Sequence, residues 1–206
     1  MSDISIREIV PAALAPATPN RPRLLVIGTA LASAAVIVGF GSLLSFYVRT
    51  RALWLASDSG TWLPSGVNIP LTQPNMMAIT LVFSLITVVW AVASMKSDDR
   101  SNTYIAVGLS IMFGFAYIAQ TAYLLSLMGL PIAGDDAGRA PLFFAVIGSH
   151  LAITGAAMAY LAIMGIRSLG GNYNAKDVEG LYGAAMFWFV TVALYFAMWY
   201  AIYITK

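Results

Sequence analysis

Long apolar runs separated by short polar or proline-containing segments dominate the hydropathy pattern of this chain. Five runs have no internal charge and are long enough to cross a hydrocarbon core, which requires about 20 helical residues. We expect these spans at Leu24–Val48, Asn75–Met95, Thr103–Met128, Leu142–Arg167 and Leu181–Thr205. None shows the period-two alternation of a membrane β-strand, so helices are expected. The pattern predicts an all-α integral membrane protein, a bundle of five transmembrane helices.

The amino-acid composition excludes several classes of function. Of the 206 residues 60% are hydrophobic and 10% are charged, whereas about a quarter of a soluble domain is charged. A net charge of +2 gives no electrostatic surface for nucleic acid. Without cysteine and with one histidine, disulfides, thiolate metal sites and bis-histidine haem are excluded within the chain. We therefore expect no catalytic residue, bound cofactor or metal ligand here.

Lysine and arginine positions predict the orientation, because cytoplasmic segments carry more of them. One side of the expected topology carries Arg7, Arg21, Arg23, Lys96, Arg100, Arg167 and Lys176, and the other carries Arg49, Arg51, Arg139 and Lys206. The excess places the N-terminus in the cytoplasm and the C-terminus outside. We expect residues 1–20 to form a flexible cytoplasmic tail and residues 21–206 to form one transmembrane domain.

Small residues recur along one face of two expected spans. They are Gly28, Ala32 and Gly39 in the first span and Gly148, Ala152 and Gly155 in the fourth. In lipid, helices approach closely only where small residues line up, because no hydrophobic force drives their association. Both faces are predicted to be helix-packing surfaces without chemistry.

Polar side chains inside the spans are few. His150 is the only ionisable one well inside a span, and Thr154 lies one turn further on. A neutral, hydrogen-bonded structural histidine and a proton-handling or ligand role both remain open. In the third span, Tyr117 and Gln120 are expected on one face, with Tyr123 three residues on. The amide of Gln120 needs partners on another helix or subunit, because an unpaired amide in hydrocarbon is costly.

Tryptophans are candidates for contacts beyond the chain. Trp62 lies in the long loop after the first span, and Trp188 and Trp199 lie in the aromatic-rich fifth span. We expect lipid or subunit contacts at these positions, since tryptophan favours membrane interfaces. No span contains aspartate or glutamate away from its ends, which disfavours an ion-coupled transporter.

Several short motifs follow one another in a specific order. They are Asn20-Arg21-Pro22, Phe46-Tyr47-Val48-Arg49, Trp62-Leu63-Pro64-Ser65-Gly66, Gly148-Ser149-His150 and Phe187-Trp188-Phe189-Val190-Thr191. In this order, with five spans, the chain resembles subunit III of haem-copper terminal oxidases in its short form. Some positions that are polar in the family differ in this chain. Ala34 in the first span and Tyr123 in the third each replace a glutamate of the family, and Ile153 and Trp188 each replace a histidine. Thr191 replaces an aspartate.

The resemblance implies an accessory, non-catalytic subunit of a cytochrome c oxidase-like enzyme in a bacterial cytoplasmic (inner) membrane. It implies oxidase subunits I and II as partners, haem and copper in those partners, and bound phospholipid. It further implies support of assembly and of proton uptake by the catalytic subunit in aerobic electron transport. Because the family's membrane carboxylates are replaced, direct proton buffering is not expected, whereas structural support is.

Other functions remain open on the sequence. The chain could serve another haem-copper enzyme, such as a nitric oxide reductase, as a subunit III-like component. It could also be a small transporter, or the membrane anchor of a quinone-linked enzyme with His150 and tyrosines near the quinone. The electron donor of an oxidase, cytochrome c or quinol, would bind on other chains.

Overall fold

A computed structural model describes residues 23–57, 62–63, 67, 69–131, 140–170 and 178–205. The long helices in these ranges are α1 (Leu24–Ala56), α2 (Thr72–Lys96), α3 (Arg100–Met128), α4 (Ala140–Leu169) and α5 (Glu179–Met198). The last continues directly into a π-helix, η4 (Trp199–Ile204). Five helical stretches, with η4 included in the last, are long and apolar enough to cross a membrane. The predicted all-α bundle of five transmembrane helices is confirmed.

Helix α1 is longer than the sequence pattern suggests. It continues past Val48 through Arg49 and Arg51 to Ala56, although these arginines were expected to end the first span. The hydropathy boundary marks where charge begins, and arginine is itself a good helix former. The predicted loop after the first span is correspondingly shorter. The expected tail over residues 1–20 lies outside the described residues.

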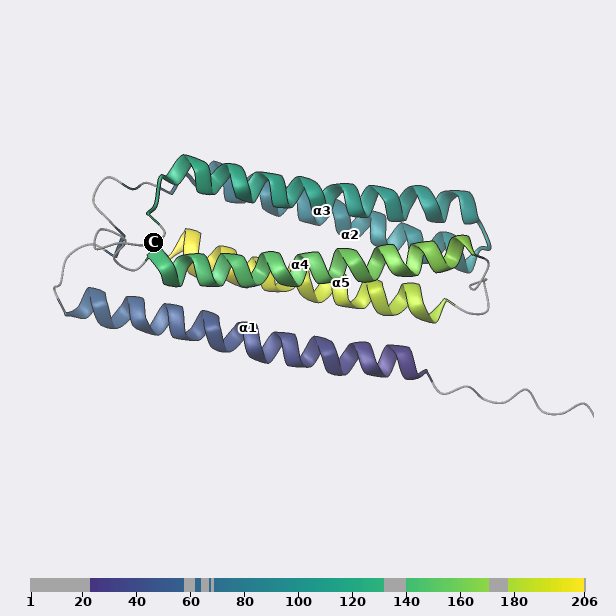
Figure 1. Cartoon of the computed structure of the whole chain (residues 1–206), viewed down its shortest axis with the longest axis horizontal. Coiled ribbons are helices and arrows are strands. Elements are labelled where there is room, and N and C mark those ends of the chain that lie inside the picture. The colour runs from purple at the N-terminus through teal and green to yellow at the C-terminus, as the bar shows by residue number, and fades with distance from the viewer. Residues whose placement is uncertain are drawn as a thin grey trace, which may run out of the picture.

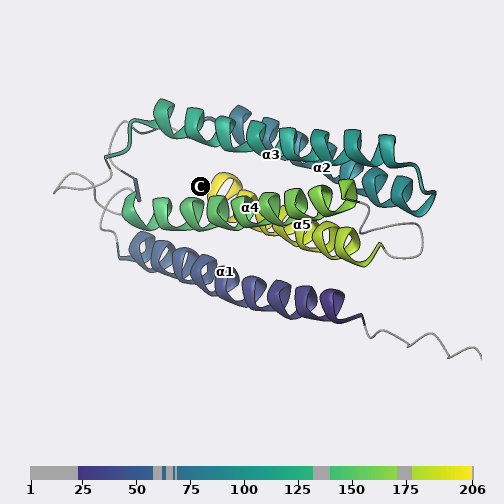
Figure 2. The same cartoon turned by 45° about the vertical axis from the view of Figure 1, so that its right-hand side comes forward.

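The helices form two antiparallel pairs and one peripheral helix (Figure 1). Helices α2 and α3 make the most extensive contact, and α4 and α5 pack against this pair. Helix α1 contacts α5 and, less extensively, α4, and it lies on the side away from α2 and α3 in both orientations (Figure 2). One face of α1 is consequently left without a neighbour from the described chain.

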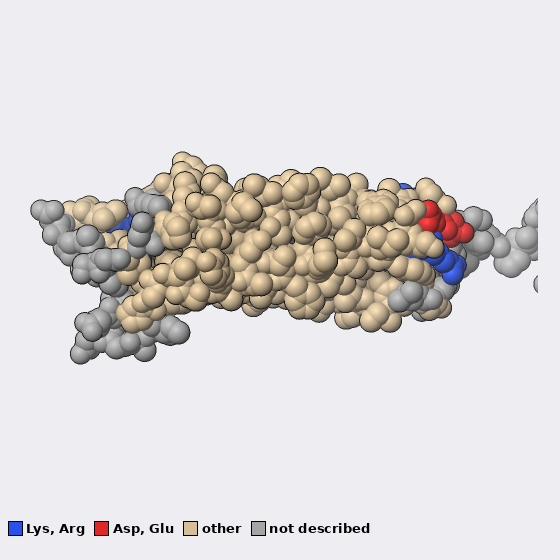
Figure 3. Space-filling model, turned by 90° about the horizontal axis from the view of Figure 1, so that it is seen from above, with Lys and Arg blue, Asp and Glu red and all other residues tan. Residues whose placement is uncertain are grey.

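Charged side chains lie at the two ends of the bundle, and the middle of the visible face is uncharged (Figure 3). Many large apolar side chains of the bundle are exposed, including Leu31, Val38, Phe115 and Ile166. In water such a surface would be unfavourable, and a lipid environment removes that cost. The chain is a multi-pass membrane protein.

The short turn between α2 and α3 is closed by a capping interaction. The carboxylate of Asp99 accepts a hydrogen bond from the backbone N–H of Asn102 at 3.1 Å and one from its side-chain amide at 2.6 Å. These bonds, the backbone one first, lower the pKa of Asp99 from its usual value. At the other end of α3, Gly129 has φ 58°, a left-handed conformation that favours glycine as the residue ending a helix.

Candidate functional site

His150 of α4 lies in the interior of the bundle and is completely buried. Its Nε2 lies 3.0 Å from the backbone oxygen of Thr191 in α5, and its Nδ1 lies 2.8 Å from the hydroxyl oxygen of Tyr117 in α3. A carbonyl oxygen can only accept, so Nε2 carries the hydrogen and Nδ1 accepts from the Tyr117 hydroxyl. A neutral imidazole satisfies both contacts.

Aromatic rings surround this imidazole on several sides. Three rings lie edge-on to it. The distance between ring centroids is 5.7 Å for Phe40 of α1, 5.5 Å for Tyr117 of α3 and 5.8 Å for Tyr195 of α5. Thr154, one turn along α4, is also buried, and its hydroxyl donates to the backbone oxygen of His150 at 2.9 Å. The arrangement gives the imidazole its hydrogen-bond partners from within the chain. A proton-handling role for it stays a hypothesis.

The three polar residues singled out in the third span, Tyr117, Gln120 and Tyr123 of α3, have different surroundings. Tyr117 faces His150, whereas Gln120 is half-buried and donates from Nε2 to the hydroxyl of Thr80 in α2 at 3.0 Å. Tyr123 is 54% exposed. Each three-residue step turns a helix by about 300°, so two steps rotate the side chain by about 120°. Tyr123 therefore lies away from Tyr117, and the partner expected for Gln120 on another helix is found in Thr80.

Both small-residue faces lie on the outside of the described chain. Gly28, Ala32 and Gly39 of α1 and Gly148, Ala152 and Gly155 of α4 are all exposed. A Cβ atom added at any of these four glycines would meet nothing within 4 Å. The glycines that are tightly packed are others, such as Gly114 of α3, where an added Cβ would lie 2.7 Å from the sulfur of Met158. Packing of the small faces against another chain stays a prediction.

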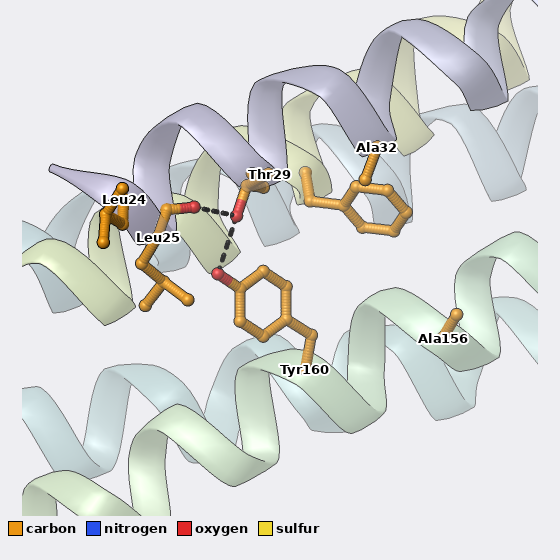
Figure 4. Close-up of a pocket in the computed structure, with 8 residues that line it drawn as sticks. Leu24, Leu25, Thr29, Ala32, Ala156 and Tyr160 are labelled. Atoms are coloured by element: carbon orange, nitrogen blue, oxygen red, sulfur yellow. Dashed lines mark hydrogen bonds between the residues drawn. The ribbon is translucent and has the colours of Figure 1, made fainter.

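A groove of about 380 Å³ lies between α1 and α4, with Phe187 of α5 also lining it (Figure 4). Gly28 and Ala32 from α1 and Ala156 from α4 contribute to its wall. The hydroxyls of Thr29 and Tyr160 lie 2.8 Å apart and connect the two helices across it (Figure 4). This groove is apolar apart from these two hydroxyls, so it suits an apolar occupant.

The tryptophans differ in accessibility. Trp188 is completely buried, and its Nε1 donates to the hydroxyl of Ser84 in α2 at 2.9 Å. The expected lipid or subunit contact of Trp188 is therefore wrong, because the core of the chain encloses the indole. Trp62 is also buried and donates to the Tyr47 hydroxyl at 3.1 Å, and half-buried Trp199 donates to Asn75 at 3.0 Å. External contacts of these two stay predictions.

Sequence reasoning did not single out three buried tyrosines, one of which, Tyr195, contacts the His150 ring. Tyr47, Tyr195 and Tyr203 are buried, and Tyr195 donates to the backbone oxygen of Pro74 at 2.6 Å. They occur in aromatic-rich segments where no helical period separates inward from outward rings. Among the described residues, no three His, Asp or Glu side chains come together as metal ligands would.

Comparison with known proteins gives a consistent result at low identity. No family model matches the chain. The chain is 24% identical over 146 residues to cytochrome c oxidase subunit 3 of Carassius auratus, and this match covers 70% of this chain and 55% of that protein. It is 25% identical over 151 residues to the same subunit of Oncorhynchus clarkii, a match that covers 70% of this chain and 55% of that protein. It is 26% identical over 144 residues to the subunit of Struthio camelus, a match that covers 69% of this chain and 54% of that protein. The matched region thus spans about half the length of these curated relatives. The chain is a divergent, subunit III-like sequence, similar to cytochrome c oxidase subunit 3.

Proposed function

We propose that this chain is a non-catalytic accessory subunit of a respiratory haem-copper oxidase in a bacterial cytoplasmic membrane. It packs against oxidase subunits I and II, which hold the haem and copper, and it supports assembly of the complex and proton uptake by the catalytic subunit. The similarity to cytochrome c oxidase subunit 3 supports the type of enzyme. Its N-terminus lies in the cytoplasm and its C-terminus outside.

The observation that carries this proposal is the outward position of the small-residue faces. A face of Gly148, Ala152 and Gly155 on α4 does not pack against another described helix, although such faces suit close helix contact in lipid. A transmembrane helix of a catalytic subunit would find there both close backbone approach and van der Waals contact. An isolated chain gains nothing from this arrangement.

Phospholipid is part of the same proposal. The groove between α1 and α4 is lined mainly by Leu24, Leu25 and small residues, and such an apolar lining suits an acyl chain. Arg23 precedes α1, and Arg167 lies in the last turn of α4, at the same end of the bundle. A phosphate head-group near this end would have cationic partners, while its chain lies along the groove.

The experiment compares two glycine substitutions. We expect Gly155→Leu to leave the fold of this chain intact, because its Cβ position is open, and to reduce recovery of the oxidase complex at least several-fold by separating it from the partner helix. Gly114→Leu is the matched control: it must displace Met158 and Trp188 and should destabilise the chain itself. Blue-native gels and the yield of folded chain provide both readouts.

A second measurement identifies the partner. The complex that co-purifies with the wild-type chain in mild detergent should show a reduced-minus-oxidised haem spectrum, and mass spectrometry should identify the catalytic subunit. Full recovery of complex with Gly155→Leu would contradict a partner on the α4 face. A chain that purifies alone without a haem spectrum would contradict the oxidase function. A catalytic subunit of another haem-copper enzyme would redirect the proposal to that enzyme.

A further inference from the structure

The groove between α1 and α4 begins at the first turn of α1, where Leu24 and Leu25 form part of its wall (Figure 4). The start of α5 lies at the same end of the bundle (Figure 1). We call the end of the groove that Leu24 and Leu25 line the groove mouth. The polar groups beside it determine which head-group a lipid in the groove can carry.

The carboxylate of Glu179 from α5 lies against the backbone of the groove mouth. Its Oε1 accepts from the N–H groups of Leu25 and Val26 at 2.9 and 3.2 Å. The start of a helix ordinarily attracts a phosphate group, because its first N–H groups are unpaired and its dipole is positive there. In this chain two of those N–H groups are already paired with a carboxylate, so the start of α1 does not favour a second anion.

The same carboxylate keeps one oxygen available. Both hydrogen bonds of Glu179 end on Oε1, and no described residue bonds to Oε2. The side chain is half-buried, so water screens its charge only in part. A cationic group with N–H donors is the partner that such an oxygen binds most strongly.

The hydroxyls deeper in the groove have no hydrogen to offer a ligand. Thr29 donates to the backbone oxygen of Leu25 at 2.8 Å, so in the 2.8 Å contact between the two hydroxyls Tyr160 is the donor (Figure 4). Gly183 of α5 permits this pairing, because a Cβ atom there would lie 2.7 Å from the Tyr160 oxygen. The side chains of the groove therefore offer apolar surface and acceptor oxygens, and a lipid phosphate or ester oxygen finds no donor among them.

We propose that the groove prefers a phospholipid with a primary ammonium head-group, that is, phosphatidylethanolamine. The ammonium donates to Oε2 of Glu179, the phosphate lies near exposed Arg23 directly before α1, and an acyl chain follows the groove. A choline head-group has the positive charge but no N–H donor, and a glycerol head-group has hydroxyl donors but leaves the lipid anionic. This inference rests on the phospholipid site of the proposed function and names its head-group.

The first test needs no variant. The delipidated full chain in mild detergent is mixed with equal amounts of phosphatidylethanolamine, phosphatidylcholine and phosphatidylglycerol that carry the same acyl chains, and native mass spectrometry measures the bound lipids. We expect phosphatidylethanolamine to be retained about two- to fivefold over each of the others, the range for a partly exposed ionic contact. Its N,N-dimethyl derivative, with one N–H donor left, should bind with an intermediate preference.

Three variants locate the contact. Glu179→Gln removes the charge but keeps an acceptor for the first turn of α1, and it should abolish the head-group preference without reducing total lipid. Asp99→Asn is the matched control, because Asp99 caps α3 at the same end of the bundle and should leave the preference unchanged. Ala32→Leu places a larger side chain in the groove wall and should reduce the binding of all three lipids.

Equal retention of the three lipids, a preference for phosphatidylglycerol, or a preference that persists in Glu179→Gln would overturn the ammonium site. If Ala32→Leu still reduces lipid binding in those cases, the groove remains a phospholipid site and only the head-group is wrong. Unchanged lipid binding in Ala32→Leu would contradict a lipid in this groove altogether. The haem spectrum and the blue-native gels test the oxidase function separately, since these lipid measurements require no partner subunit.

Discussion

At the residue scale, the environment of His150 determines what the side chain can do. Its two ring nitrogens contact the Thr191 carbonyl and the Tyr117 hydroxyl at 3.0 and 2.8 Å, and the side chain is fully buried. Each bond contributes a net of about 1 kcal/mol, but leaving a buried partner unsatisfied costs about 1–3 kcal/mol. Removing one partner of such a hydrogen bond should therefore lower the free energy of unfolding by more than the net contribution of the bond.

Replacement of the histidine by an apolar residue should show this asymmetry. We expect His150→Leu to reduce the free energy of unfolding by about 2–4 kcal/mol, because it leaves the Tyr117 hydroxyl without its acceptor. His150→Gln supplies an amide donor and acceptor and should lose less. Thermal unfolding in detergent measures both variants. Equal losses for the two would show that ring packing, and not hydrogen bonding, governs this position.

The same pair of variants separates the structural role from a proton-handling role. If the oxidase assignment holds, His150→Gln should leave turnover and proton pumping of the purified complex within about twofold, because glutamine replaces a neutral hydrogen-bonding group. Normal assembly verified on blue-native gels is the control. Loss of pumping in a correctly assembled complex would instead require His150 to exchange protons.

At the element scale, α1 packs along α5 but buries few of its own residues. Its buried residues are Thr29, Ser33, Phe40 and Tyr47. The first turn is fixed by α5, because the carboxylate of Glu179 accepts from the backbone N–H groups of Leu25 and Val26 at 2.9 and 3.2 Å. A carboxylate from another helix therefore takes the place of a local N-cap and complements the helix dipole.

Removal of this carboxylate should loosen the first turn of α1 locally. We expect Glu179→Ala to accelerate hydrogen exchange at the Leu25 and Val26 amides by about 2- to 30-fold, which corresponds to the usual cost of a lost cap. Glu179→Gln retains an acceptor and should have a smaller effect. Asp99→Ala is the matched control, since Asp99 caps α3 and should leave these amides unchanged. Unaltered exchange in Glu179→Ala would exclude capping as the function of the contact.

The start of α3 should depend on pH through Asp99. Its pKa is lowered in the folded chain by the backbone N–H and the side-chain amide of Asn102. Ionised Asp99 therefore stabilises this turn fully at pH values above the pKa that Asp99 has in the unfolded chain. This stabilisation is lost as the pH falls through the lower pKa that Asp99 has in the folded chain. Exchange at the Asn102 amide should accelerate in this acidic range, and Asp99→Asn should remove the pH dependence. A pH dependence that persists in Asp99→Asn would belong to another group.

The spans could be predicted because hydropathy integrates over many residues, whereas single side-chain directions could not. The five helices follow from uncharged runs of about 20 residues. The π-helix that ends the fifth span, with Tyr203 buried in it, was not indicated by any local pattern. The enclosed position of Trp188 depends on α2 and α3, so the fifth span alone could not reveal it. The small faces were recognisable, but their outward position required the complete arrangement of helices.

At the scale of the whole molecule, the distribution of charge and the order of helices define two ends. The N-terminus of α1, the α2–α3 turn and the start of α5 lie at one end, and the ends of α1, α3 and η4 lie at the other (Figure 1). Arg23, Lys96, Arg100 and Arg167 lie toward the first end. Lysine and arginine favour the cytoplasmic side, so we expect the first end to face the cytoplasm. Labelling one position at each end is enough to test this orientation.

Cysteine labelling tests this orientation cleanly, because the natural chain has no cysteine. Ala56→Cys lies at the end of α1 and Ser97→Cys lies in the α2–α3 turn, and both positions are exposed. In intact cells with a permeabilised outer envelope, a membrane-impermeant maleimide should label Ala56→Cys and should label Ser97→Cys only after the inner membrane is disrupted. The unmodified chain controls for background. The reverse labelling pattern would place the N-terminus outside, and the small-residue face would then meet its partner helix in the inverted direction.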